Sequence, residues 1–303
     1  MSPSALRITK RATVPGWIVL PTPTGILIAG AGRLFELDPE EGGAPQVASG
    51  GWDYDFARLA DAGDGTILIA SGRTLWRFDP RDRSIVDRHD LAGLGYLDAV
   101  VRTRSGTWVT ASNGEQNVLA RIDLDTGKVL ERFPVDQGVH QIAEADGYLF
   151  VMSQSYPALV RVDLVSGDMT SIRVGPGSIA VVGSRIWVAT DDEVACIYAD
   201  HLTPCGEIPV ARAGSSLSSD GQTLWLLSFT GSKDPSIYLP DPNQPATVTM
   251  LDGNTGEILA GPLRLPDHTP ATIAAFHEHV WIGFHDTGTI LQVGRCDPAV
   301  CAA

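Results

Sequence analysis

The chain has 303 residues, 44% of them hydrophobic, and carries a formal net charge of -14. This acidity argues against nucleic acid or an anionic membrane as the main partner, because both select for clustered Lys and Arg. No apolar run reaches the roughly eighteen residues that a transmembrane helix needs, so the sequence predicts no membrane span.

Short apolar segments recur along the chain at a regular spacing. The second, third and fourth copies each begin 41 residues after the copy before. A strand with one wet face would alternate in polarity, so segments that are apolar throughout predict strands packed between two neighbouring sheets. The seven copies are Gly25–Gly30, Thr66–Ser71, Thr107–Ser112, Tyr148–Ser153, Arg185–Thr190, Thr223–Ser228 and His279–Phe284.

A partner strand follows each apolar segment, and most of these partner strands end in Asp. Asp bonds its own backbone two residues further on, and Gly supplies the positive φ that closes a hairpin. The clearest such turns begin at Asp123, Asp163 and Asp252. The partner strands are Leu34–Asp38, Leu75–Asp79, Leu119–Asp123, Leu159–Asp163, Val194–Tyr198, Val248–Asp252 and Ile290–Gly294.

A repeat of about forty residues with four short strands per copy is the signature of a β-propeller blade. The sequence therefore predicts an all-β fold, a seven-bladed β-propeller with four-stranded antiparallel blades, as one domain over residues 1–303. We expect Ala5–Ala12 to be the outer strand of the last blade, which removes the open sheet edge of the ring. The predicted blades begin near Gly16–Pro21 and then cover Tyr54–Leu91, Tyr96–Val135, Val139–Val174, Gly177–Val210, Ser215–Leu265 and Ala271–Arg295.

Blade 6 carries an insertion at about residues 229–247, rich in Pro and polar residues. In a propeller this connection emerges on the same face as the starts of the inner strands, at the mouth of the central channel. Long loops in compact domains are often functional, so the insertion is a candidate lid that places Tyr238 against a ligand. The alternative is a surface insertion, which loops tolerate at small entropic cost.

The four cysteines form two local pairs, Cys196 with Cys205 and Cys296 with Cys301. Both pairs are candidate disulfides, and four free thiols are the alternative. The N-terminus lacks the apolar core of a signal peptide, which predicts a cytoplasmic protein. Disulfides would favour an oxidising compartment, so a secreted protein remains the alternative location.

No specific catalytic or nucleotide-binding motif is present, so candidate residues follow from their position in the fold. Two sets of positions face the channel mouth: the starts of the inner strands and the connections after the second strands. Polar and aromatic groups that converge on one concavity are the default binding site. The predicted substrate-binding residues are Trp52, Tyr54, Tyr96, Asp98, Gln141, Asn113, Tyr156 and Tyr238.

His140, at the start of an inner strand, is the first candidate for a general acid or base, because histidine titrates near neutral pH. His268 and His285 belong to blade 7 and would face it across the mouth. The alternative for His140 is a channel-lining histidine bonded to a backbone carbonyl.

The carboxylates of the mouth are candidate ligands of a divalent cation such as Mg²⁺. Asp53, Asp55 and Glu115 offer the hard oxygen atoms that such a cation prefers. The alternative is that each carboxylate bonds local backbone N–H groups or is solvated in a loop.

The Asp-x-x-Thr-Gly turns, the apolar strands and the blade period resemble the YVTN/NHL class of seven-bladed propellers. Within that class, Gly138–Ile142 is similar to the Gly-Pro-His-Gly-Ile segment of the streptogramin (virginiamycin B) lyases, with Val139 and Gln141 in place of Pro and Gly. The resemblance implies an elimination that opens a cyclic depsipeptide, with His140 as the base and a magnesium ion. It also implies a glutamate and a second histidine, for which Glu115 and His285 are candidates by position alone.

Two functions follow from these observations. The first is an enzyme that acts on a small or cyclic metabolite at the channel mouth by lyase- or cyclase-type proton transfer. A stand-alone propeller with a candidate lid favours it. The alternative is a non-catalytic scaffold that binds a ligand at the mouth or a protein on the rim. The absence of a catalytic motif favours the scaffold, because a fold does not by itself determine function.

Overall fold

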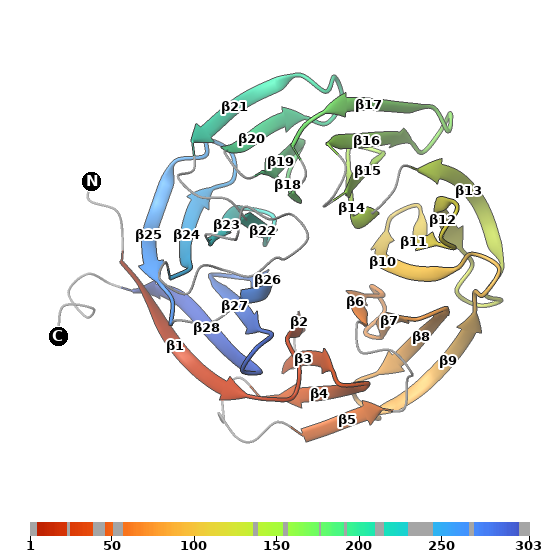
Figure 1. The fold of residues 1–303 in the computed structure, drawn as a ribbon, viewed down its shortest axis with the longest axis horizontal. Coiled ribbons are helices and arrows are strands. Elements are labelled where there is room, and N and C mark those ends of the chain that lie inside the picture. The colour runs from red at the N-terminus through yellow and green to blue at the C-terminus, as the bar shows by residue number, and fades with distance from the viewer. Residues whose placement is uncertain are drawn as a thin grey trace.

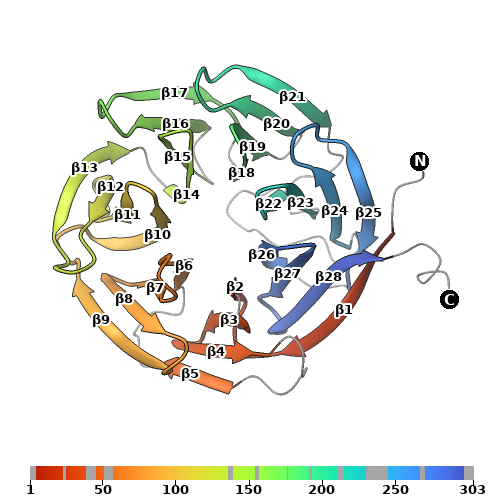
Figure 2. The same ribbon diagram turned by 180° about the vertical axis from the view of Figure 1, so that it is seen from behind.

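The protein is described from a computed structural model, which covers residues 5–22, 25–38, 46–50, 57–135, 139–153, 157–175, 177–190, 193–209, 215–229, 245–266 and 270–296. Every regular element of these residues is a β-strand, and the strands form seven four-stranded sheets. The sheets stand around a central axis as the blades of a ring, shown from its two faces in Figures 1 and 2. The predicted all-β, seven-bladed propeller is confirmed.

Each blade runs outward from the channel through antiparallel neighbours, and the first three blades show the pattern. Blade 1 consists of β2 (Ile18–Thr22), β3 (Gly25–Gly30), β4 (Arg33–Leu37) and β5 (Gln46–Gly50). Blade 2 consists of β6 (Arg58–Asp61), β7 (Ile67–Ser71), β8 (Thr74–Asp79) and β9 (Ser84–Asp90). Blade 3 consists of β10 (Tyr96–Thr103), β11 (Gly106–Ser112), β12 (Asn117–Ile122) and β13 (Val129–Val135).

The next three blades repeat this order. Blade 4 consists of β14 (Val139–Ala145), β15 (Tyr148–Ser153), β16 (Ala158–Asp163) and β17 (Met169–Arg173). Blade 5 consists of β18 (Ser178–Val182), β19 (Arg185–Ala189), β20 (Glu193–Tyr198) and β21 (Pro204–Pro209). Blade 6 consists of β22 (Ser215–Ser219), β23 (Thr223–Ser228), β24 (Thr247–Asp252) and β25 (Ile258–Arg264), and most of its predicted insertion lies outside the described residues.

The ring closes as predicted, because blade 7 contains both ends of the chain. Its strands are β26 (Pro270–Phe276), β27 (His279–Phe284), β28 (Thr289–Cys296) and, outermost, β1 (Ala5–Thr13). β1 pairs with β28 from Ala5 opposite Cys296 to Thr13 opposite Thr289. Figure 1 shows β1 lying along β28 at the outside of the ring. Ring closure therefore depends on one pair of strands from opposite ends of the sequence.

The core lies between the blades and is built mainly by the second strands, whose residues are buried almost throughout. Trp108, Trp187, Trp225 and Trp281 all lie in second strands and are at most 2% exposed. Trp76 differs from these four: it is partly exposed, and the guanidinium of Arg88 lies 4.6 Å from the centre of its ring. The difference arises because Trp76 is in β8, a third strand, where burial is not continuous.

The predicted Asp turns form at the ends of the third strands. At the first of them, Asp123 Oδ1 accepts hydrogen bonds from the backbone N–H groups of Asp125 (2.9 Å) and Thr126 (3.1 Å). Gly127 closes the turn with a φ of 67° and donates to the Asp123 carbonyl. The same arrangement recurs at Asp163 and Asp252. These backbone hydrogen bonds favour the ionised carboxylate and lower its pKa in all three turns.

One of the two cysteine pairs is a described disulfide. Cys196 of β20 is bonded to Cys205 of β21, and their Cα atoms are 5.0 Å apart. Cys296 is also disulfide-bonded, while its predicted partner Cys301 lies outside the described residues. The free-thiol alternative is therefore wrong for Cys196 and Cys205. Among the described residues, no helix has the length and apolarity to cross a bilayer.

Candidate functional site

The antiparallel order of the blades divides the connections between two faces of the ring. We call the face that carries the starts of the inner strands and the second-to-third connections the mouth face. The opposite face carries the first-to-second and third-to-fourth connections. Tyr96 starts β10 and His285 follows β27, so both are at the mouth face, as predicted.

Several predicted site residues fall outside the described part of the chain. Of His140, only the backbone is described. The residues of which nothing is described are Trp52, Asp53, Tyr54, Asp55, Tyr156, Tyr238 and His268. Their assignment to the site stays a prediction, and so does the proposed Mg²⁺.

Tyr96 is the most exposed aromatic residue described at the mouth face. Its exposed fraction is 48%, and the guanidinium of Arg73 lies 4.7 Å from the centre of its ring. Arg73 belongs to the turn between β7 and β8 of the neighbouring blade. The backbone N–H of Leu97 donates to the carbonyl of Gly72 at 2.7 Å, which ties the start of β10 to this turn. Two neighbouring blades thus present a stacked Tyr–Arg pair to solvent.

Asp98 lies beside this pair in a β-bulge of β10. The strand register with β11 shifts between Leu97 and Ala99, so Asp98 is the additional residue. The side chain is half-buried, and this burial raises the pKa of Asp98, although the positive charge of Arg58 opposes the rise. Arg58 of β6 also donates from Nε to the Asp98 carbonyl at 3.1 Å. Tyr96, Arg73, Asp98 and Arg58 form one cluster, which we call the mouth cluster.

We predict that Asp98→Asn stabilises the protein at neutral pH. Because the pKa is raised, the folded protein holds the Asp98 proton more tightly than the unfolded chain does. Stability from this group is therefore full below the ordinary value of 3.8 and is lost as the pH rises through the folded pKa. The neutral amide in Asp98→Asn has no charge to bury, so the variant does not lose this stability at neutral pH. Urea unfolding across this pH range should show a gain that disappears in acid.

The exposed Asp82 provides the matched control, and Asp82→Asn should show no gain of this kind. A loss of stability in Asp98→Asn at neutral pH would mean that attraction to Arg58 outweighs the burial of the carboxylate.

His140 occupies a bulge in the next inner strand. The register of β14 with β15 shifts between Val139 and Gln141, so His140 is the additional residue there. β26 of blade 7 has the same irregularity between Pro270 and Thr272. Bulges are common beside active sites because they redirect a side chain. The orientation of the His140 side chain stays a prediction.

Gln141 has a structural role that the sequence did not indicate. Its side-chain Oε1 accepts the backbone N–H of Ile179 at 2.6 Å, and its Nε2 donates to Ser178 Oγ at 3.3 Å. Ser178 Oγ also accepts the backbone N–H of Leu217 at 3.0 Å. Since these residues are in blades 4, 5 and 6, the Gln141 amide is part of a chain of hydrogen bonds between inner strands. It is therefore engaged in holding blades together.

Asn113 and Glu115 lie in the turn between β11 and β12, close to Tyr96, because Tyr96 pairs with Ser112. Asn113 Oδ1 accepts the backbone N–H groups of Glu115 (3.0 Å) and Gln116 (2.8 Å), and it therefore closes its own turn. Glu115 is exposed. Within the described residues, no group of three His, Cys, Asp or Glu side chains is placed to hold a metal ion.

His285 lies elsewhere on the mouth face, at the seam between blades 7 and 1. Its ring is exposed and meets the ring of Trp17 edge-on, with 4.3 Å between centroids. The structure thus brings Tyr96, Asp98 and Asn113 together and places His285 at a separate seam. Arg58 and Arg73 were not predicted as site residues because the polar and aromatic candidates at the mouth included no arginine. Trp17 was not predicted either, although it is aromatic and stands at the predicted start of blade 1. Aligning the blades and searching mouth positions for cations would have found Arg73.

Comparison with known proteins supports the fold alone. No protein-family model matches the chain, and no curated protein matches it. Among solved structures, BamB from Moraxella catarrhalis has a TM-score of 0.63 and 11% identity, covering 96% of this chain and 100% of that one. The β-propeller domain of Cps50 (Swd1) from Myceliophteria thermophila has a TM-score of 0.67 and 12% identity, covering 95% and 99%. Both likenesses concern the overall fold, and identities this low carry no function across.

Proposed function

We propose that this protein is a non-catalytic binding propeller that recognises a peptide segment of a partner protein at the mouth cluster. The observation that carries the proposal is the exposed Tyr96 ring stacked with Arg73 between blades 2 and 3. Tyrosine and arginine are enriched among the residues that dominate binding energy at protein interfaces.

The geometry of the cluster supports recognition of a peptide. Stacking with Arg73 and the hydrogen bond from Leu97 to Gly72 hold the start of β10 in place before a partner arrives, which lowers the entropic cost of binding. The half-buried Asp98 carboxylate supplies an acceptor for a peptide N–H or a cationic side chain. We therefore expect a partner segment with an apolar or aromatic residue beside a basic one.

Selection of random peptides displayed on phage against the immobilised wild-type protein tests the proposal. Selected peptides should bind Tyr96→Ala at least about tenfold more weakly, because an aromatic anchor of an interface contributes on the order of 2 kcal/mol or more. Tyr198→Ala is the matched control, since Tyr198 is 38% exposed and has the guanidinium of Arg185 5.7 Å from its ring centre on the opposite face.

Selected peptides should bind Tyr198→Ala as they bind the wild type. If peptides bind all three proteins equally, or if none can be enriched, the mouth cluster is not a peptide site.

A lyase-type enzyme is the second candidate function, and it follows from the resemblance to the YVTN/NHL propellers. It is favoured by the raised pKa of Asp98 on β10, next to β14 with His140 in its bulge, because perturbed carboxylates and histidines gather at catalytic sites. In that case a cyclic metabolite incubated with Mg²⁺ would be consumed by the wild type and by Tyr198→Ala, and not by His140→Ala. Mass spectrometry would detect the consumption, which would replace the binding proposal with an enzyme.

The Cys196–Cys205 disulfide is relevant to the compartment in which this protein would bind its partner. Structural disulfides persist in oxidising surroundings and are rare in the cytosol. We therefore favour an extracytoplasmic location, the alternative to the cytoplasmic one first expected, and hence a partner segment that is exposed in the same compartment.

A further inference from the structure

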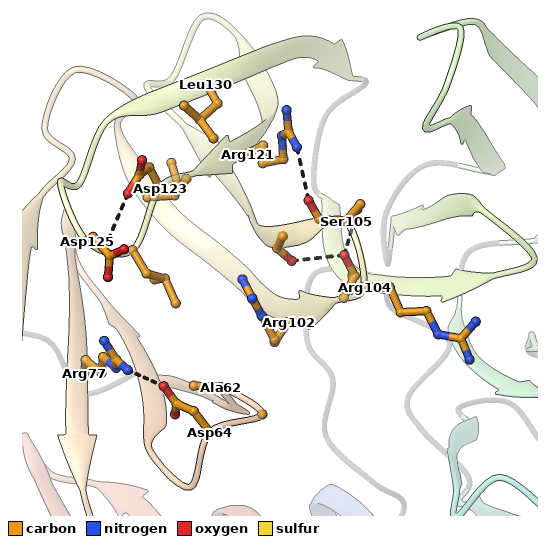
Figure 3. A pocket seen from close by; sticks show the side chains of 15 residues that line it. Ala62, Asp64, Arg77, Arg102, Arg104, Ser105, Arg121, Asp123, Asp125 and Leu130 are labelled. Carbon is orange, nitrogen blue, oxygen red and sulfur yellow. Dashed lines mark hydrogen bonds and ion pairs between the residues drawn. The ribbon is translucent and has the colours of Figure 1, made fainter.

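A cavity of about 590 Å³ lies on the opposite face, between blades 2 and 3. It lies on the other face of the ring from the mouth cluster, at the opposite ends of β6 and β10. Its walls are the β6–β7 turn, the β10–β11 turn and the Asp turn after β12, with contributions from β8 and β13 (Figure 3). This volume is in the range that holds a small organic ligand.

The cavity is rich in arginine although the whole chain is strongly acidic. Four of the chain's 22 Lys and Arg residues line it, namely Arg77, Arg102, Arg104 and Arg121. Two of these are neutralised locally: Arg77 pairs with Asp64, and Arg121 pairs with Glu131. Arg77 also donates to Thr66 Oγ1 at 3.0 Å, and Arg121 donates to the Ser105 carbonyl at 3.1 Å. These two side chains therefore form fixed walls.

Arg102 differs from both. It extends from the β10–β11 hairpin into the space in front of the Asp123–Asp125 turn (Figure 3). The hydrogen bond described for its guanidinium goes to Thr107 Oγ1, at 3.2 Å, and within the described residues it has no ion pair with a carboxylate. Most of its five N–H donors therefore remain available to a ligand.

The neighbouring Asp123 carboxylate forms no ion pair with Arg102. Asp123 Oδ1 is engaged by the backbone N–H groups of Asp125 and Thr126, and these bonds lower the pKa of Asp123. The turn before β7 approaches the stem of Arg102 closely, since a Cβ at Gly63 would lie 3.8 Å from Arg102 Cγ. Leu130, which is 51% exposed, provides an apolar patch at the cavity wall. The cavity thus combines the available guanidinium of Arg102 with polar and apolar walls.

We propose that this cavity binds a small polar molecule through an oxyanion, a phosphate or a carboxylate, held by Arg102. The planar guanidinium suits such a group because it donates two parallel hydrogen bonds to two oxygens. Asp125 lies at the cavity wall, where its carboxylate can accept hydrogen bonds that hydroxyl groups of the same ligand donate. This site is independent of the proposed peptide site.

Isothermal titration calorimetry with inorganic phosphate and with acetate, at constant ionic strength maintained with chloride, tests the proposal. We expect saturable binding of at least one anion and about tenfold weaker binding by Arg102→Gln, since one charge-assisted contact corresponds to roughly that factor. Arg132→Gln is the matched control: it removes the same charge from an exposed position on β13 outside the cavity, and should bind like the wild type.

Tighter binding of phosphate would identify a phosphate ester as the natural class of ligand, and tighter binding of acetate a carboxylic acid. Arg102→Lys keeps the positive charge but loses the planar guanidinium with its two parallel donors, so it should bind the anion with intermediate strength. The same variant tests the proposal if Arg102→Gln does not fold. Absence of saturable binding, or equal weakening by Arg102→Gln and Arg132→Gln, would overturn the proposal.

Discussion

Gly95→Ala should destabilise the protein by about 2–5 kcal/mol, the sum expected for a strained backbone conformation and for overpacking. Gly95 has a φ of 107°, and a Cβ added there would overlap the carbonyl oxygen of Ser112. This oxygen belongs to the backbone of β11 and cannot rotate away. The start of β10 would therefore have to move, and Tyr96 with it. Urea unfolding of the variant measures the effect.

Gly114→Ala isolates the clash from the backbone strain. Gly114 lies in the same blade with a φ of 90°, but a Cβ there would meet no atom within 4 Å. Its substitution should cost only the conformational strain, about 1–2 kcal/mol. Equal losses of stability in the two variants would show that the contact with the Ser112 carbonyl does not contribute to the effect of Gly95→Ala. Because Gly95 precedes Tyr96, its substitution should also weaken the binding of the peptides that were selected at the mouth cluster.

Leu6→Ala is expected to cost about 2–4 kcal/mol, as for other truncations of buried leucine. Leu6 is 7% exposed and belongs to the apolar cluster between blades 6 and 7 that includes Val248 and Val293. It is carried by β1, the strand that closes the ring, so its loss leaves a cavity at the only place where the two ends of the chain meet in the described sheets. Thermal and urea unfolding measure the change.

Ile8→Ala on the same strand is the control for Leu6→Ala. Ile8 is 38% exposed, so its truncation should change the free energy of unfolding by less than about 1 kcal/mol. If both variants lose the same small amount, the side chains of β1 do not contribute to closure, and the backbone pairing with β28 alone holds the ring.

The candidate site was predicted from the sequence only as far as the repeat could be counted. Tyr96, Asp98 and Asn113 were placed at the mouth because the starts of inner strands and the connections after second strands share a face. Their neighbours were not predicted: Arg73 and Arg58 come from the preceding blade, and contacts between blades leave no periodic signal. Gln141 was predicted to contact a ligand. Its hydrogen bond with Ile179 could not be predicted, because that bond also crosses a blade boundary.

The cavity at Arg102 could not be found from the sequence. Its walls combine turns and strand ends of two blades, and its arginines are spread over residues 77–121. Whether each arginine is free or paired depends on side-chain geometry: Asp64 neutralises Arg77 across a hairpin, and no spacing rule distinguishes that case from Arg102.

By itself, the sequence determined the all-β fold, the number of blades, the closing strand and the Asp turns, because each rests on local chemistry repeated every forty or so residues. Apolar segments of this length must be buried on both faces, and a ring of sheets is the arrangement that achieves this. The tertiary structure alone decided which polar side chains join the blades, which cysteines are bonded and which cations remain available. Some of these outcomes depend on contacts between blades, such as the hydrogen bond between Gln141 and Ile179, which only the closed ring brings within reach. Others, such as the Cys196–Cys205 disulfide and the Arg77–Asp64 ion pair, depend on side-chain geometry within one blade.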